Sequence, residues 1–166
     1  MSPLDILTGT PVWVWPLLAL ILVLGLNAVR DRKSPIWILA VLPLLGILGL
    51  RSMLTIHAAA LGWLLFAVAY AGGVLIGRAL QPRWLFGVAD GRVHLKGEAL
   101  TLTLTLSLFM LNYATGVLRA VAPEVVASPV VQIVFPLIEG AISGLFLGRF
   151  LATLAVVRGR LRPQAV

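Results

Sequence analysis

The amino-acid sequence predicts an all-α protein, a polytopic bundle of about five transmembrane helices, and three observations support this prediction. Hydrophobic residues make up 60% of the 166 residues and charged residues only 11%, whereas soluble domains are nearer half apolar and a quarter charged. The apolar residues form stretches of the length that crosses hydrocarbon. Basic residues gather at the ends of these stretches. Because five spans leave only short connections, residues 1–166 are expected to form a single integral membrane domain.

The positions of the spans follow from where the apolar runs stop. The first run ends at residues 30–33, where three of the four residues are basic. The second run is short and contains Pro43, and Ser34 and Pro35 before it suit a helix N-cap and first turn. Polar connections separate the later runs. We expect the five spans at about residues 12–29, 35–53, 54–77, 99–118 and 130–157.

The connection between the third and fourth spans, residues 78–98, contains a hairpin signal. Two short alternating runs flank Asp90 and Gly91, and an Asp-Gly pair is typical of a type I′ turn. An isolated hairpin of this size is marginally stable in water. We therefore expect a small β-hairpin in this inner loop, resting on the helices or on the membrane surface.

The start of the fourth run has a pattern that nominally indicates a strand. Leucines alternate with hydroxyl residues from Leu100 to Leu108, which is a period of two. A lone strand in hydrocarbon would leave its backbone groups unpaired, at a cost of several kcal/mol each. We predict a helix, because Ser and Thr hydroxyls can bond back to the preceding turn.

The distribution of lysine and arginine predicts the orientation. With the N-terminus outside, ten of these residues face the cytoplasm and only Arg51 and Arg119 face outward, so the C-terminus is expected in the cytoplasm. The net charge of +7 is therefore expected to set topology and to contact anionic lipids; the basic residues follow no helix face that would suit nucleic acid. The ten inner residues are Arg30, Arg32, Lys33, Arg78, Arg83, Arg92, Lys96, Arg158, Arg160 and Arg162.

The composition excludes several kinds of chemistry. The sequence has no cysteine, which excludes disulfides, thiol catalysis and iron–sulfur ligation. His57 and His94 are expected on opposite sides of the membrane, so they cannot ligate one metal or haem. The sequence has no nucleophile with an adjacent base and no phosphate-binding loop. We expect a non-enzymatic protein without cofactor or metal and, since no basic start precedes the first span, without a removable signal peptide.

One acid, Glu139, falls near the middle of the fifth span. The apolar residues of that span contribute roughly −5 kcal/mol to insertion, against about 3 kcal/mol for one central charged group, so the segment still inserts. We expect Glu139 to face the bundle and to carry a proton at neutral pH, because desolvation disfavours the charged form. Asn112 and Tyr113 lie at comparable depth and are its expected partners. The carboxyl would act in a proton or solute relay, or would be locked into a helix–helix hydrogen bond.

Further polar side chains share helix faces with this acid. Pro136 also lies on its face and frees a backbone carbonyl one turn away. Arg149 is expected to snorkel at the cytoplasmic boundary, about 15 Å along the helix from Glu139 and so beyond pairing distance. The candidate polar site consists of Glu139, Gln132, Ser143, Asn112, Tyr113 and Thr105.

Small residues at four-residue spacing predict close helix packing. Gly140, Gly144 and Gly148 form such a seam on the fifth span, and Gly73 and Gly77 continue a similar seam on the third. The two seams could pack against each other, or one of them could pack against a second copy of the protein. Packing within the chain is the simpler alternative.

Four segments carry a resemblance to a known family. They are TPVWVW at residues 10–15, RDRK at residues 30–33, the Asp90-Gly91 pair of the inner loop, and SGLFLGR at residues 143–149. In their order they resemble a family of small uncharacterised bacterial inner-membrane proteins that carry a domain of unknown function. The resemblance covers nearly the whole chain. It implies a location in the bacterial cytoplasmic membrane, and it implies no activity, substrate or catalytic residue.

Two functions are compatible with these features. The first is a non-enzymatic membrane protein that acts through helix–helix association, with itself as a homo-oligomer or with a larger membrane complex, and the glycine seams suggest it. The second is a small proton- or solute-conducting carrier or channel in which Glu139 is the working group.

Overall fold

A computed structural model describes residues 9–55, 60–89 and 91–159, and within these ranges the chain is mostly helical. Four of its helices have 20 or more residues, and one has 15. The long helices are α2 (Val14–Ala28), α3 (Ile36–Thr55), α4 (Ala60–Leu80), α5 (Leu100–Val121) and α7 (Pro129–Val157); the short elements are β1 (Arg32–Pro35), the 3-10 helix η1 (Gln81–Trp84), β2 (Leu85–Ala89), β3 (Arg92–Leu95) and α6 (Pro123–Val126).

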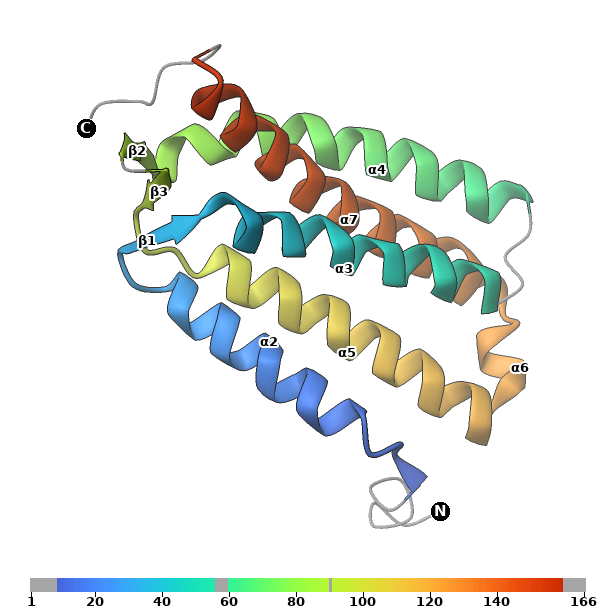
Figure 1. The fold of residues 1–166 in the computed structure, drawn as a ribbon. Coiled ribbons are helices and arrows are strands. Elements are labelled where there is room, and N and C mark those ends of the chain that lie inside the picture. The colour runs from blue at the N-terminus through green and yellow to red at the C-terminus, as the bar shows by residue number, and fades with distance from the viewer. Residues whose placement is uncertain (1–8, 56–59, 90, 160–166) are drawn as a thin grey trace.

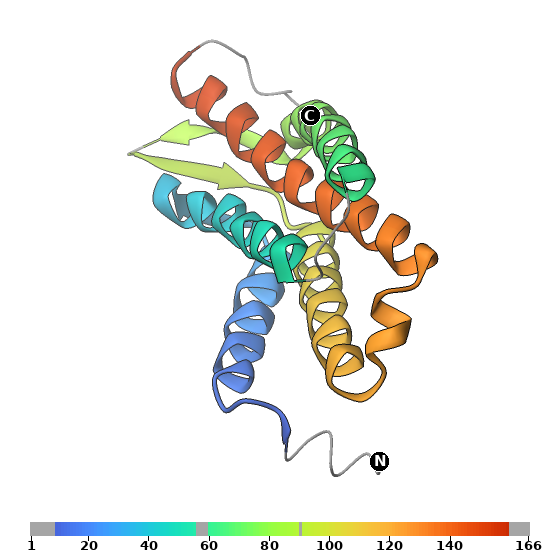
Figure 2. The same ribbon diagram turned by 90° about the vertical axis from the view of Figure 1, so that its right-hand side faces the viewer.

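The long helices run back and forth between two ends of the molecule (Figure 1). One end carries the three strands, and we call it the sheet end; the opposite end carries α6. Helix α7 packs most extensively against α4 and also against α3, whereas α2 packs mainly against α5 (Figure 2). The chain order places the described cations of residues 30–33, 78–96 and 158 at the sheet end, with Arg51 and Arg119 at the other. This is the separation that the orientation prediction requires.

The number of spans differs from the sequence prediction. Among the described residues three segments, not five, are long and apolar enough to cross a membrane: Ala60–Trp84, Leu100–Val121 and Pro129–Val157. Helix α2 has 15 residues and rises about 22 Å, short of the roughly 30 Å of hydrocarbon. The apolar part of α3 is equally short, because Arg51 and Ser52 follow Leu50. Three candidate spans nevertheless indicate a multi-pass membrane protein.

Helices α4 and α7 meet through the two glycine seams. A Cβ atom added at Gly140, Gly144 or Gly148 would fall well inside van der Waals contact with a backbone carbonyl of α4, and the same holds for Gly73 and Gly77 against α7. The two backbones therefore touch directly, as small residues at this spacing permit. The seams face each other within one chain.

Helix α5 confirms the helical reading of the alternating Leu-Thr run. Its hydroxyls bond back to the preceding turn: Thr105 Oγ1 donates to the Thr101 carbonyl at 2.8 Å, and Thr103 Oγ1 donates to the Ala99 carbonyl at 3.1 Å. These hydroxyls therefore have hydrogen-bond partners within the helix. The backbone groups, which a lone strand would leave unpaired, are bonded along the same helix. Their period-two pattern reflects composition and not backbone conformation.

The three strands form one antiparallel sheet in the order β1-β3-β2. The predicted hairpin is present as β2 and β3, with Gly91 at φ 69° after a turn whose Asp90 lies outside the described residues. Strand β1 was not predicted: Ser34 and Pro35, expected to begin the second helix, instead pair with Val93 and Arg92. Strand β1 escapes prediction because it is too short to show a pattern of alternation. It forms through a long-range contact, with a partner strand about sixty residues further along the chain.

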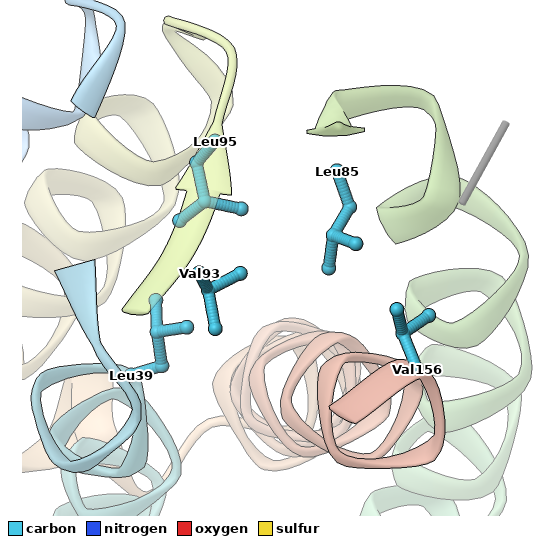
Figure 3. Packing of buried hydrophobic residues seen from close by; sticks show 5 residues of the cluster. All are labelled: Leu39, Leu85, Val93, Leu95 and Val156. Carbon is cyan, nitrogen blue, oxygen red and sulfur yellow. The ribbon is translucent and has the colours of Figure 1, made fainter. Parts of the chain in front are cut away.

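The sheet rests on the helices through one apolar cluster. Leu85, Val93 and Leu95 from the sheet pack with Leu39 of α3 and Val156 of α7, and their side chains point toward one another (Figure 3). Val93 is completely buried. The helices thus supply the support that a small sheet needs.

Candidate functional site

Glu139 lies in the interior of α7 and has no exposed surface. The side-chain amide of Asn112 on α5 donates to both carboxyl oxygens, at 3.2 and 3.1 Å from Nδ2. Ser52 of α3 donates through Oγ to Oδ1 of Asn112. One buried polar group therefore joins three helices, and we call Glu139, Asn112 and Ser52 the core acid site.

Two glycines of α3 make room for this site. A Cβ atom at Gly49 would overlap the Glu139 carboxyl, and one at Gly46 would press on Ser143 at 3.2 Å from its Cβ. Ser143 is 1% exposed, and its Oγ has no hydrogen-bond partner in the part of the chain that the structure describes. The backbone of α3 therefore covers the acid directly.

Among the residues that the structure describes, no counter-charge is seen at the core acid site. The ion pair that the structure shows joins Arg149 to Glu98 and does not involve Glu139. The Glu139 carboxyl is bonded by the neutral amide of Asn112. A carboxyl buried in this way is held by hydrogen bonds alone, which is an uncommon and usually functional arrangement inside a membrane.

The structure places the other predicted site residues elsewhere on the same helices. Tyr113 is not at the acid: its hydroxyl bonds with Thr10 at 2.9 Å, and its ring stacks on Phe109. Gln132 donates to the Val126 carbonyl of α6 at 3.1 Å. Thr105 is buried and bonds back within α5. Ser52 was missed, although its hydroxyl at the end of the second apolar run was a usable signal.

A second buried polar group lies at the sheet end. Arg149 of α7 donates to Gln81 Oε1 from Nε at 2.7 Å, to Thr101 Oγ1 at 3.0 Å and to Glu98 Oε1 at 2.7 Å. Its guanidinium also lies over the Trp84 ring, 5.4 Å from the centroid. We call these five residues the ion-pair cluster.

Arg149 does not snorkel, so that prediction was wrong. The residue is 5% exposed, and the carboxylate of Glu98 compensates its charge inside the bundle. Snorkelling is expected where no acid is within reach. No local pattern predicts this pair, because Glu98 and Arg149 are far apart along the chain.

The loop before α5 fixes the position of Glu98. Gly97 donates its backbone N–H to Asp31 Oδ1 at 2.6 Å, and Glu98 donates its own to the Ala28 carbonyl at 2.8 Å. A Cβ atom at Gly97 would overlap the Val29 carbonyl. The Glu98 carboxylate also accepts the Thr101 N–H at 2.9 Å in the first turn of α5, where a negative charge suits the helix dipole.

These observations define the class of protein: a multi-pass helical membrane protein with two buried polar groups at different depths and a small sheet at one end. Comparison with protein families, with curated proteins and with solved structures finds no match. The resemblance to small bacterial inner-membrane proteins therefore stays a prediction.

Proposed function

We propose that this protein is a small non-enzymatic carrier that moves protons, alone or with a solute, across the bacterial cytoplasmic membrane, and that Glu139 carries the proton. The single observation that supports this most is an acid with no exposed surface, bonded to a neutral amide and with no ion pair seen in the described part of the chain, in the interior of a candidate span. Intramembrane acids of this kind are costly, and they commonly mark proton or ion pathways.

The place of Glu139 among the helices supports the proposal. Helix α5 contacts α7 much less extensively than α4 does, so the α2–α5 pair joins the rest of the bundle through a sparse interface. The acid lies on that interface, bonded across it to Asn112. Carriers commonly bind their ions near the midplane between two groups of helices that move against each other.

Asn112 suits an acid that gains and loses a proton. Its amide donates to both carboxyl oxygens, at nearly equal distances. An amide donor can serve either oxygen of a carboxylate or the carbonyl oxygen of the protonated acid. Asn112 can therefore keep its hydrogen bond to Glu139 whether the carboxyl is protonated or ionised.

Association with a second copy or with a larger membrane complex is the competing proposal, and it has less support. The glycine seams that suggested it face each other inside the chain. The apolar side chains left on the outside of α4, such as Leu64, Val68 and Leu75, suit lipid equally well.

Proton flux into liposomes tests the proposal. The protein is reconstituted with a pH-sensitive dye inside, and an external pH step is applied to wild type, Glu139→Gln and the control Glu124→Gln, which changes an exposed carboxyl in the same way. Glu139→Gln should reduce the flux to that of empty vesicles, and Glu124→Gln should leave it unchanged. Equal flux in wild type and in a folded Glu139→Gln protein, or no wild-type flux above empty vesicles, would reject the proposal.

A further inference from the structure

A small cavity lies at the sheet end, beside the ion-pair cluster. Its volume is about 10 Å³, and its polar lining consists of Arg32, Gln81, Arg149 and Thr153, with apolar side chains completing the wall. This volume fits one oxygen-sized atom. Three of these side chains, Arg32, Gln81 and Arg149, carry N–H donors around a space for a single acceptor, whereas Thr153 already donates its hydroxyl to the Arg149 carbonyl at 3.0 Å.

The charges around the cavity do not balance. Arg149 is paired with Glu98, but Arg32 has no ion pair within the described ranges and makes one long bond, from Nη1 to the Asn27 carbonyl at 3.3 Å. Burial lowers the pKa of the Arg32 guanidinium; the charge of Glu98 raises it and that of Arg149 lowers it further. Two cations therefore line the cavity, and the one carboxylate paired with them, Glu98, lies outside its lining; an anion in the cavity would balance the charge of Arg32.

The guanidinium groups have donors to spare. Arg149 uses three of its five N–H groups in hydrogen bonds to Gln81, Thr101 and Glu98, and Arg32 uses one in its bond to Asn27. Arginine forks match phosphate oxygens in geometry, and the pairing is strengthened by charge. Arg32 is half-buried at the rim, directly after α2, where the chain leaves the apolar layer.

We propose that this cavity binds one oxygen of a phosphate group, with Arg32 as the main ligand at the rim and Gln81, Arg149 and Thr153 facing the bound oxygen. Basic pockets between helices at a membrane surface bind the phosphates of anionic lipids in this manner. Free inorganic phosphate has the same chemistry, and the experiment separates the two sources. The site is independent of proton transport at Glu139.

The experiment uses the full-length protein in nanodiscs. Native mass spectrometry counts retained phosphatidylglycerol in discs of phosphatidylcholine with phosphatidylglycerol, and a thermal-shift titration with inorganic phosphate uses discs of phosphatidylcholine alone. The variant is Arg32→Gln, and the control is Arg83→Gln, an exposed cation at the same end. Arg32→Gln should lower the affinity about five- to tenfold and the control less than about twofold, since one basic contact contributes about 1 kcal/mol.

Each outcome is decisive. Retention of phosphatidylglycerol that depends on Arg32, without a phosphate response, identifies a lipid headgroup; an Arg32-dependent shift with inorganic phosphate identifies free phosphate. Equal losses in both variants, or no binding of either probe to wild type, would mean that the cavity holds water only and would overturn the proposal. If Arg32→Gln does not fold, Arg32→Lys takes its place and should give an intermediate loss, because it keeps the charge without the fork.

Discussion

The two buried acids of this protein differ in how their charge is handled. Glu98 lies at the sheet end with Arg149 at 2.7 Å, a backbone N–H of α5 and the Thr101 hydroxyl around it. Glu139 lies in the interior of α7, where the neutral amide of Asn112 donates to its carboxyl. The Glu98 carboxylate is thus paired with a cation, whereas the Glu139 carboxyl is bonded to a neutral amide. This difference is why we propose a structural role for Glu98 and proton exchange for Glu139.

The largest effect should come from removing the cation of the ion-pair cluster. Arg149→Met leaves Glu98 buried without its counter-charge, and we expect a loss of about 3–5 kcal/mol in the free energy of unfolding, measured by denaturant unfolding in detergent. The double variant Glu98→Leu with Arg149→Met should recover most of this loss. If Arg149→Met were as stable as wild type, the ion pair between Arg149 and Glu98 would not stabilise the fold.

A smaller loss should follow from disturbing the loop that holds Glu98. Gly97→Ala forces a methyl group against the Val29 carbonyl, and we expect a loss of about 2–3 kcal/mol by the same measurement. Gly87→Ala is the matched control, because open space surrounds that glycine, and it should change stability much less. Equal effects would show that Gly97 does not position the acid.

Removing the partner of Glu139 should cost less again. Asn112→Leu takes away the amide that serves both carboxyl oxygens, and we expect a loss of about 1–2 kcal/mol, because a buried acceptor is left unsatisfied. The variant should also reduce proton flux in liposomes. Unchanged stability together with unchanged flux would show that Asn112 contributes to neither.

The smallest effect on stability should come from the acid itself. Glu139→Gln keeps the shape and one acceptor oxygen for Asn112, so we expect a change of less than about 1 kcal/mol in the free energy of unfolding. A loss as large as that of Arg149→Met would make Glu139 a structural residue like Glu98, and the contrast between the two acids would disappear.

Local patterns in the sequence predicted local structure well. The Asp-Gly pair predicted the hairpin of β2 and β3, and the argument from unsatisfied backbone groups predicted a helix for α5 despite its alternating residues. The comparable depths of Asn112, Tyr113 and Glu139 predicted that the two former residues would be partners of the acid, and the structure brings Asn112 but not Tyr113 to it. The hairpin and the α5 helix were decided by interactions within a few residues, and the partner of the acid by depth in the bundle.

Features that join distant segments were not predicted. Strand β1 pairs with β3 across a long stretch of chain, and the ion-pair cluster unites η1, α5 and α7. A four-residue strand has no periodicity to detect, and an isolated Glu98 before an apolar run looks like an ordinary loop residue. The expected count of five spans was wrong because α2 has only 15 residues and the apolar part of α3 stops at Leu50, before Arg51 and Ser52.

The position of α7 has a consequence for how the protein is made. Helices enter a membrane in the order of synthesis, and α7 is the last of the described helices. It brings both Glu139 to Asn112 and Arg149 to Glu98. Until α7 has been made, Asn112 lacks the carboxyl that its amide serves and Glu98 lacks its counter-charge, so a single helix completes both polar groups.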